Sequence, residues 1–387
     1  MDDFSSLEIS RFRREFAIDQ LGIYLDHAAV SPLPARTRRR MVVALEEATS
    51  EADSAWTRRL AEVERVRGLA ATLLHAQPEE IAFVPNTSTG LSLVAEGLSW
   101  RSGDNVVGCE SEFPANVYPW TGLDHFGVEY RRVGERDGAR IDLDDIAAAI
   151  DDRTRVVALS WVQFASGFKL DLAAIAELCR ERGVLCVVDA IQGLGALELD
   201  VEKVGVDVVV AGGHKWLLAP EGVGICYIAE RVLERIRPVI RGWLSVKEPF
   251  GPAAGAPEYL KRASRFEVGT ANVVGIYGLG ASLELLSEAG ASRIERRVLS
   301  LTEHAALGLE DMGFKIVGGR TREEKSGIVA GRPPEGMEAK AIAAGLNTRR
   351  VQLVERAGRL RVAPHFYTTH DEIDLFLETL SEVLSKQ

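Results

Sequence analysis

Two short runs of β-branched residues constrain the fold of this chain more than any other feature of its sequence. They are Val184–Val188 and Val206–Val210, in which apolar residues follow one another with little of the alternation expected of a half-exposed strand. Strands of this kind are buried on both faces, as in a parallel sheet covered by helices. The sequence therefore predicts an α/β fold.

Neighbouring segments extend this pattern. Asp171–Arg182 places its apolar residues on one helical face, and Gly183 is positioned to end that helix. Three earlier apolar runs are further predicted strands: Ile81–Val84, Asn105–Cys109 and Arg155–Val162. Strands that alternate with helices in this way build a mostly parallel sheet.

The chain changes character near Arg241–Glu258, where Gly and Pro are frequent and indicate a linker or lid. Beyond it we expect a long helix over Val274–Leu309 and an amphipathic C-terminal helix. Between them we expect short strands near Phe314–Val317, Gly327–Val329 and Val351–Val362. These elements predict a smaller second α/β unit, which suits a chain of 387 residues.

The composition excludes several classes of protein. The 46 basic and 57 acidic residues give a net charge of −11, whereas nucleic-acid binding needs clustered positive charge. No apolar run reaches the roughly 20 residues of a membrane helix, and the N-terminus lacks the apolar core of a signal peptide. The cysteines stand singly among apolar residues, at Cys109, Cys179, Cys186 and Cys226. We therefore expect a cytoplasmic protein with no disulfide, metal site, membrane contact or nucleic-acid partner.

Asp189 and Lys215 are the residues that point most clearly to chemistry. Asp189 directly follows one predicted strand, and Lys215 follows the next after two glycines and His214. The two positions are 26 residues apart, enough for one crossover. Both side chains should then lie at the carboxyl ends of neighbouring strands, where open α/β sheets bind ligands. A structural ion pair is the alternative, but the apolar surroundings of Lys215 are unusual for a solvated charge.

A buried lysine beside a buried aspartate suits pyridoxal phosphate. Desolvation lowers the pKa of a lysine, and a neutral amine is what forms a Schiff base with the cofactor's aldehyde. An aspartate keeps the pyridine nitrogen protonated, so that the ring accepts electrons from a carbanion at the substrate's Cα. Lys215 and Asp189 are therefore the candidate catalytic residues.

The cofactor's phosphate needs hydrogen-bond donors. Asn86–Gly90, between a predicted strand and a helix, offers hydroxyl groups and backbone N–H groups at a helix N-terminus, although an ordinary N-cap explains the same residues. Phe113 is a candidate to cover the cofactor ring, or simply packs in its loop. Arg361 is a candidate to bind a substrate carboxylate in a fork geometry, or lies on the surface at a strand end.

Taken in order, these segments resemble the class V aminotransferase superfamily of fold-type I pyridoxal phosphate enzymes. That group includes cysteine desulfurases, selenocysteine lyases and isopenicillin N epimerase-like proteins. The resemblance runs from about Tyr24 to the C-terminus and rests on YLDHAAVSPLP, NTSTGLSLVA, VVDAIQ, GGHKWL, FEVGTAN and RLRVAPHFYTTHDEID. It implies a fold-type I α/β architecture, with an N-terminal segment (1–20) on the small domain, a large cofactor-binding domain (21–260) and a small C-terminal domain (261–387).

The resemblance also implies roles for individual residues. It assigns Ser88 and Thr89 to the phosphate, Phe113 to the ring face, Asp189 to the pyridinium and Gln192 to the ring oxygen. It further implies that Thr270 reaches the phosphate of a neighbouring subunit, and hence a homodimer. The remaining assignments are Lys215 with His214 at the Schiff-base site, and His27 and Arg361 at the substrate carboxylate.

This sequence departs from the desulfurase branch at three places. Gly212 replaces a serine that often binds phosphate there, and Gln163 stands where desulfurases have an asparagine near the cofactor. Most importantly, Asn347–Leu360 contains no cysteine, whereas a desulfurase needs a mobile thiol in this stretch to accept sulfur. We therefore expect an aminotransferase-like enzyme acting on an α-amino acid, with a C–S lyase or an epimerase as the alternative.

A non-catalytic, cofactor-binding member of the fold is a further possibility. It has no need of the amine of Lys215, so the sequence favours an enzyme. A nicotinamide dehydrogenase would need a glycine-rich fingerprint that the sequence lacks.

Overall fold

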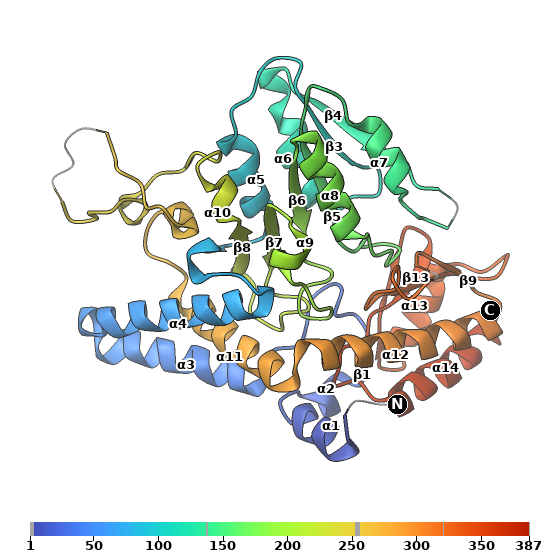
Figure 1. Ribbon diagram of the computed structural model, residues 1–387. Coiled ribbons are helices and arrows are strands. Elements are labelled where there is room, and N and C mark those ends of the chain that lie inside the picture. Colours follow the sequence, from blue (N-terminus) through green and yellow to red (C-terminus); the bar gives the residue numbers. More distant parts are fainter. Residues whose placement is uncertain (1–3, 137, 252–255, 320, 387) are drawn as a thin grey trace.

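A computed structural model describes residues 4–136, 138–251, 256–319 and 321–386. Its centre is a seven-stranded sheet with the order β2-β8-β7-β6-β5-β3-β4 (Figure 1). The strands are β2 (Ile81–Val84), β3 (Asn105–Cys109), β4 (Glu129–Val133), β5 (Thr154–Ser160), β6 (Leu185–Asp189), β7 (Val208–Gly212) and β8 (Gly224–Ile228).

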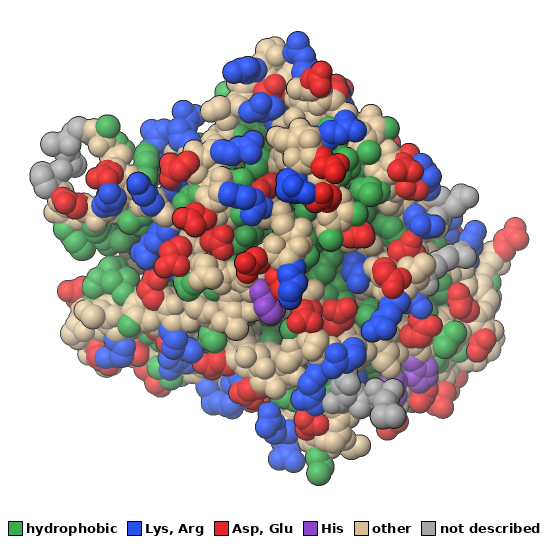
Figure 2. Space-filling view, viewed as in Figure 1, with side chains coloured by type: hydrophobic (Ala, Val, Ile, Leu, Met, Phe, Trp, Pro, Cys, Tyr) green, Lys and Arg blue, Asp and Glu red, His purple; other side chains and the backbone are tan. Residues whose placement is uncertain are grey.

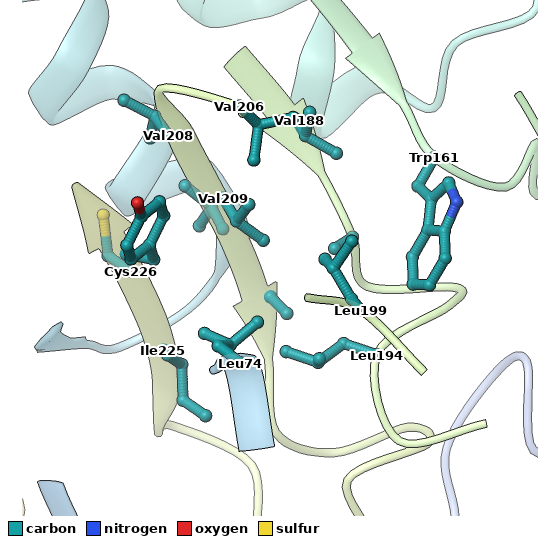
Figure 3. Packing of buried hydrophobic residues seen from close by; sticks show 14 of the residues in the cluster. Leu74, Trp161, Val188, Leu194, Leu199, Val206, Val208, Val209, Ile225 and Cys226 are labelled. Carbon is teal, nitrogen blue, oxygen red and sulfur yellow. The ribbon is translucent and has the colours of Figure 1, made fainter. Parts of the chain in front are cut away.

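Five neighbouring strands, β4, β3, β5, β6 and β7, run parallel, as the β-branched runs predict. Every residue of β6 and β7 is buried, because side chains pack on both faces of these strands. Figure 3 shows this packing, with Val188 of β6 and Val209 of β7 among buried residues from several elements. β8 and β2 join the other edge antiparallel to their neighbours, so the sheet is mixed, and mostly parallel.

Helices cover both faces of this sheet (Figure 1). α8 (Leu172–Arg182) follows the predicted boundaries, because Asp171 accepts a hydrogen bond from the N–H of Ala174 and Gly183 takes a left-handed conformation with φ 67°. The other α-helices between residues 35 and 240 are α3 (Ala35–Ser50), α4 (Trp56–Leu74), α5 (Thr87–Gly97), α6 (Tyr118–Thr121), α7 (Leu143–Ala149), α9 (Val201–Val204) and α10 (Glu230–Leu233).

The later part of the chain builds a four-stranded antiparallel sheet, in the order β12-β13-β10-β9. Its strands are β9 (Lys315–Val317), β10 (Val329–Arg332), β12 (Val354–Arg356) and β13 (Arg359–Val362). A second hydrophobic cluster lies between this sheet and its helices. These helices are α12 (Ala291–Asp311), α13 (Ala339–Asn347) and α14 (His370–Leu384).

The helix predicted over Val274–Leu309 is two helices. α11 (Val273–Ala289) ends at Gly290, whose φ of 84° continues no α-helix, and α12 starts at the next residue. α11 packs with α3 and α4, whereas α12 extends beneath the four-stranded sheet (Figure 1). The glycine thus redirects the chain from one sheet to the other.

The N-terminal segment lies against the later half of the chain. It contains α1 (Ser6–Arg13) and α2 (Ile18–Leu21), followed by β1 (Ile23–Tyr24), which pairs in parallel with β11 (Val351–Gln352). Phe12 contacts Phe366 edge-on and Phe16 stacks on Tyr367. The division into domains at residues 20 and 260 stays a prediction.

The described surface is mixed in charge. Figure 2 shows Lys and Arg interspersed with Asp and Glu over one face, without an extended area of either sign. Among the described residues, no helix is both long enough and apolar enough to cross a bilayer.

Candidate active site

A cavity of about 300 Å³ opens where the carboxyl ends of β5, β6 and β7 meet. Its walls come from the loops after these strands, from the start of α5 and from the β12–β13 hairpin. Asp189 and Lys215 both line it. The expectation that neighbouring strands bring these two side chains together is therefore met in the geometry, because β6 pairs with β7.

Lys215 lies between β7 and β8, in the loop where the chain leaves the parallel part of the sheet. The N–H of Gly213 donates to the carbonyl of Val223 at 2.8 Å, which closes this loop. Burial lowers the pKa of Lys215 to about 8, and the carboxylate of Asp189 acts against that shift. At pH 7.5 roughly a quarter of such an amine is neutral, against about a thousandth for an unperturbed lysine. Lys215 therefore has the properties of a nucleophile.

Asp189 is the last residue of β6 and only 1% exposed. One of its carboxylate oxygens accepts a hydrogen bond of 3.0 Å from the N–H of Ile191. Burial raises the pKa of Asp189, and the nearby Glu112 acts in the same direction. A buried carboxylate of this kind is stabilised by a cation in the cavity, which a protonated ring nitrogen supplies.

The start of α5 forms part of the cavity wall. Asn86, Thr87 and Ser88 line the cavity, whereas the hydroxyl of Thr89 donates to the side chain of Asn86 at 3.1 Å. Thr89 therefore takes part in capping the helix, and Thr87 lies in the wall instead. The hydroxyl of Thr87 accepts a hydrogen bond of 3.0 Å from the N–H of Gly212, which ties α5 to the end of β7.

Gly90 permits this close approach of α5 to the sheet. A Cβ at this position would lie 2.5 Å from Cγ1 of Val210 in β7. Because that distance is shorter than any real carbon contact, a side chain here would push the N-terminus of α5 away from β7. The backbone N–H groups of the first turn, an anion-binding arrangement, thus depend on a glycine.

Two aromatic rings lie at the mouth of the cavity. Phe113 contacts Phe164 edge-on, with ring centroids 5.2 Å apart. The Nζ of Lys215 lies 5.6 Å from the ring centroid of Phe113. Phe113 is 44% exposed and lines the cavity, so it contributes an apolar ring without an exchangeable proton, and its place over the cofactor ring stays a prediction.

Gln192 and His214 line the cavity together with Lys215, and the role of Gln192 toward the cofactor's ring oxygen stays a prediction. The amide of Gln192 donates to the carbonyl of Ala28 at 3.0 Å and accepts from the indole of Trp216 at 3.1 Å. Burial lowers the pKa of His214, and Lys215 acts in the same direction. At neutral pH the ring of His214 is therefore neutral.

The β12–β13 hairpin carries arginines on the face turned toward the cavity. Leu360 and Val362 of β13 enter the second core, so the alternation of the strand places Arg359 and Arg361 on the opposite face. Val354 pairs with Arg361, which puts Arg356 on the same face. Of these three arginines, Arg356 and Arg361 line the cavity.

Arg356 is a charged lining residue that sequence reasoning missed. It precedes a two-residue turn, Ala357-Gly358, in which both residues have positive φ, 51° and 73°. That turn type is the commonest in two-residue hairpins. A recognised turn at Ala357-Gly358 together with the assignment of Arg361 to the cavity would have placed Arg356 by alternation.

Three predicted site residues do not line the cavity of the single chain: Thr89, which takes part in capping α5, His27 and Thr270. The ring of His27 is fully buried, with Nδ1 at 2.8 Å from the carbonyl of Ala363 and Nε2 at 2.6 Å from the hydroxyl of Tyr367. Both ring nitrogens are therefore occupied within the protein. Thr270 is exposed, just before the start of α11, and its role toward a second subunit stays a prediction.

Pyridoxal phosphate fits the residues that are present. The cavity holds a lysine of lowered pKa, a buried carboxylate and a helix N-terminus. It also holds a cationic side chain with an unused donor, because the Nε of Arg361 is buried and has no partner among the described residues. An amine nucleophile, an anion for the ring nitrogen, a phosphate cradle and a carboxylate donor are the groups that such a cofactor and an amino-acid substrate require.

Comparisons with known proteins agree with this arrangement. The sequence model of the family described as Aminotransferase class-V matches residues 23–375. A probable cysteine desulfurase of Methanothermobacter thermautotrophicus is 30% identical over 393 residues, which cover 96% of this chain and 97% of that protein.

Solved structures of a protein called C-DES are also similar. A variant of C-DES with glycine covalently linked to its pyridoxal phosphate cofactor has a TM-score of 0.88 and 26% identity, covering 96% of this chain and 99% of that one. The complex of the cystine C–S lyase C-DES with its reaction product cysteine persulfide has a TM-score of 0.86 and 25% identity, covering 93% and 97%. These likenesses confirm the predicted fold and cofactor.

Proposed function

Because the chain belongs to the class-V aminotransferase family of pyridoxal phosphate enzymes, we propose that it is a carbon–sulfur lyase that acts on a sulfur-containing α-amino acid. Its sulfur product would leave the cavity directly, without transfer to a thiol of the protein. One observation carries this proposal: the hairpin that carries two arginines into the cavity turns in two residues and has no cysteine.

The four cysteines lie elsewhere and are between 0% and 2% exposed. Cys109, Cys186 and Cys226 are within strands, and Cys179 is on the buried face of α8. Burial raises the pKa of Cys226 to about 12 and that of Cys109 well above its usual value. A sulfur acceptor has to be exposed and partly ionised, so these thiols support release over transfer.

The residues of the cavity suit removal of a proton from Cα. The bound cofactor supplies an electron sink for the carbanion. Lys215 would take the Cα proton, and Asp189 would hold a proton on the ring nitrogen. Loss of the Cα proton, together with departure of the sulfur from Cβ with the electron pair of the C–S bond, leaves an unsaturated amino acid. Water then converts this product to a keto acid and ammonia.

Phe113 supports a single-base mechanism. Its ring lines the cavity near Lys215 and has no acid or base group, whereas epimerisation needs a proton delivered to the face opposite the base. Elimination needs only Lys215. Transamination is the second candidate, because the same lysine could return the proton to a different carbon, and the family takes its name from that reaction.

Product analysis separates these reactions. The holoenzyme would be incubated with L-cystine, with L-cysteine and with a panel of other amino acids. We expect pyruvate and ammonia in equal amounts without any added keto acid. Keto acid that forms only when a second keto acid is supplied would establish transamination, and accumulation of the opposite enantiomer would establish epimerisation.

Single replacements of the cysteines by Ala or Ser are the control within this experiment. Each should leave the rate per folded molecule within about threefold and cost about 1 kcal/mol of stability as a small core change. If one replacement stops turnover with an unchanged melting temperature and cofactor spectrum, that thiol accepts the sulfur. The proposal that sulfur leaves the cavity directly is then wrong.

We also propose that the enzyme works as a homodimer in the cytoplasm. Large apolar side chains are exposed, with Tyr118 71%, Phe250 83% and Ile240 54% accessible, and Tyr118 lines a groove that shares Ser88 and Phe113 with the cavity. A second copy that covers this groove would bury Tyr118. The free cysteines suit a reducing compartment.

Thr270 provides the test of the dimer. Sedimentation at working concentration should show a dimer, and Thr270→Val should weaken cofactor binding at least threefold without a change in melting temperature, because an exposed hydroxyl contributes little to folding. A fully active monomer would contradict the dimer.

A further inference from the structure

Asp26 contacts Arg361, a lining residue of the cavity, from outside the cavity wall. The Nη2 of Arg361 donates to Oδ1 of Asp26 at 2.9 Å, and both residues are buried, at 8% and 2% exposure. Burial raises the pKa of Asp26, and the guanidinium of Arg361 acts against that shift. Asp26 itself does not line the cavity, and the lining side chain to which its carboxylate is hydrogen-bonded is Arg361.

The backbone fixes the position of Asp26 relative to Arg361. The N–H of Ala363 donates to the carbonyl of Leu25 at 2.8 Å, and the N–H of His27 donates to the carbonyl of Ala363 at 3.2 Å. The residues on both sides of Asp26 are therefore bonded to Ala363, two positions after Arg361. Because these bonds join the N-terminal segment to the end of β13, the carboxylate of Asp26 is held in a defined place.

Arg361 has a second fixed partner on the other side. Its Nη1 donates to the carbonyl of Phe164 at 3.0 Å. A guanidinium is planar and carries five N–H donors, so two anchored nitrogens define its plane. The Nε remains, buried and without a partner among the described residues, and an unpartnered buried donor is costly unless a ligand takes it.

We propose that Asp26 is a positioning residue for substrate recognition: it holds the guanidinium of Arg361 in the orientation that presents its unused donors to the carboxylate of the amino acid. The proposal rests on the proposed assignment of Arg361 to that carboxylate and extends it to a residue with no contact to the substrate. Without this anchor, Arg361 is free to turn toward other acceptors and loses its alignment with the carboxylate.

The proposal predicts a loss that is confined to ligands with a carboxylate. The probes are S-methyl-L-cysteine and its primary amide, which differ only at that group. Binding of each to the holoenzyme is followed by the change in the visible spectrum of the cofactor. In Asp26→Ala the acid should bind at least tenfold more weakly, which corresponds to about 1.4 kcal/mol, and the amide should bind as in wild type.

Two conservative variants separate position from charge. Asp26→Asn keeps an acceptor oxygen in place and should bind the acid within about threefold of wild type, or more tightly. Asp26→Glu keeps the charge but displaces it by one methylene, and should show the same selective loss as Asp26→Ala. If Asp26→Ala does not fold, Asp26→Glu gives the required comparison.

Asp207→Ala is the matched control. Asp207 is also 8% exposed and forms an ion pair with an arginine, Arg231, at 3.0 Å. It directly precedes β7, at the end of that strand away from the cavity. Asp207→Ala should leave the ratio of acid binding to amide binding unchanged. Equal losses for acid and amide in the Asp26 variants, or equal effects of Asn and Ala, would show that Asp26 is merely structural and overturn the proposal.

The experiment does not depend on the lyase reaction. If product analysis shows transamination, the ratio of acid to amide binding still tests Asp26. Arg361→Gln provides the reference: it should abolish the preference for the acid. If it leaves that preference unchanged, Arg361 does not bind the carboxylate, and the proposals for both residues are wrong.

Discussion

Lys215→Ala is expected to abolish turnover with every amino acid that the wild-type enzyme accepts. Removal of the amine eliminates both the nucleophile that binds the cofactor's aldehyde and the base for the Cα proton. Proton transfer alone contributes about 10²–10⁴-fold to such a rate. The melting temperature of the apoprotein should change little, because Lys215 faces the cavity rather than the core.

Lys203→Ala is the matched control for this variant. Lys203 is exposed in α9 and pairs with Asp200, so its loss should leave the rate and the cofactor spectrum unchanged. Turnover in Lys215→Ala within tenfold of wild type, with the fold intact, would remove Lys215 from the mechanism.

The lowered pKa of Lys215 has a measurable consequence for cofactor loading. Because the neutral amine is the reactive form, the rate of cofactor capture by the apoprotein should rise about tenfold per pH unit below pH 8 and level off above it, given a pKa of about 8. An unperturbed lysine would give a rise that continues beyond pH 10. Stopped-flow absorbance between pH 6 and 9 distinguishes the two profiles.

Asp189→Asn is expected to produce the second large effect. The cofactor should still bind, because the lysine and the phosphate cradle are intact, but the rate should fall about a hundredfold or more, corresponding to about 2.7 kcal/mol of lost transition-state stabilisation. The reason is that a neutral amide no longer favours a protonated ring nitrogen, so the ring is a weaker electron acceptor.

Asp207→Asn is the control for the Asp189 variant. Asp207 accepts a hydrogen bond of 2.8 Å from the N–H of Cys186, at the end of β6 away from the cavity. Its replacement should cost stability and leave the rate per folded molecule unchanged. Unaltered kinetics in Asp189→Asn would mean that this carboxylate is only structural.

The large sheet could be predicted because its signal is local. The β-branched runs at β6 and β7 are buried on both faces, so their sequences carry the pattern without reference to their partners. The break at Gly290 was harder to foresee, because a single glycine within a helical pattern often persists in the helix. Only the packing of α11 and α12 against different parts of the molecule decides that the chain turns there.

The residues of the candidate site also differ in how well the sequence predicts them. Asp189 and Lys215 follow strands directly, so the topology places them at one edge of the sheet. Arg356 could be placed only once the local turn at Ala357-Gly358 is recognised. The role of Asp26 depends on a contact between segments that are distant in the chain, the hydrogen bond from Arg361 to Asp26. His27 lies within a motif, YLDHAAVSPLP, that resembles the family. Its ring nevertheless points to Ala363 and Tyr367 instead of the cavity.

The pairing of β2 with β8 determines when the site can form. It joins Ile81 to Tyr227, and the loop with Lys215 is closed only when β8 has also paired with β7. Contacts between residues so far apart form slowly, because a long loop loses entropy before the strands gain anything from pairing. The loop that carries Lys215 therefore closes late in folding, and the site that holds the cofactor is completed only after the long-range strand pairs have formed.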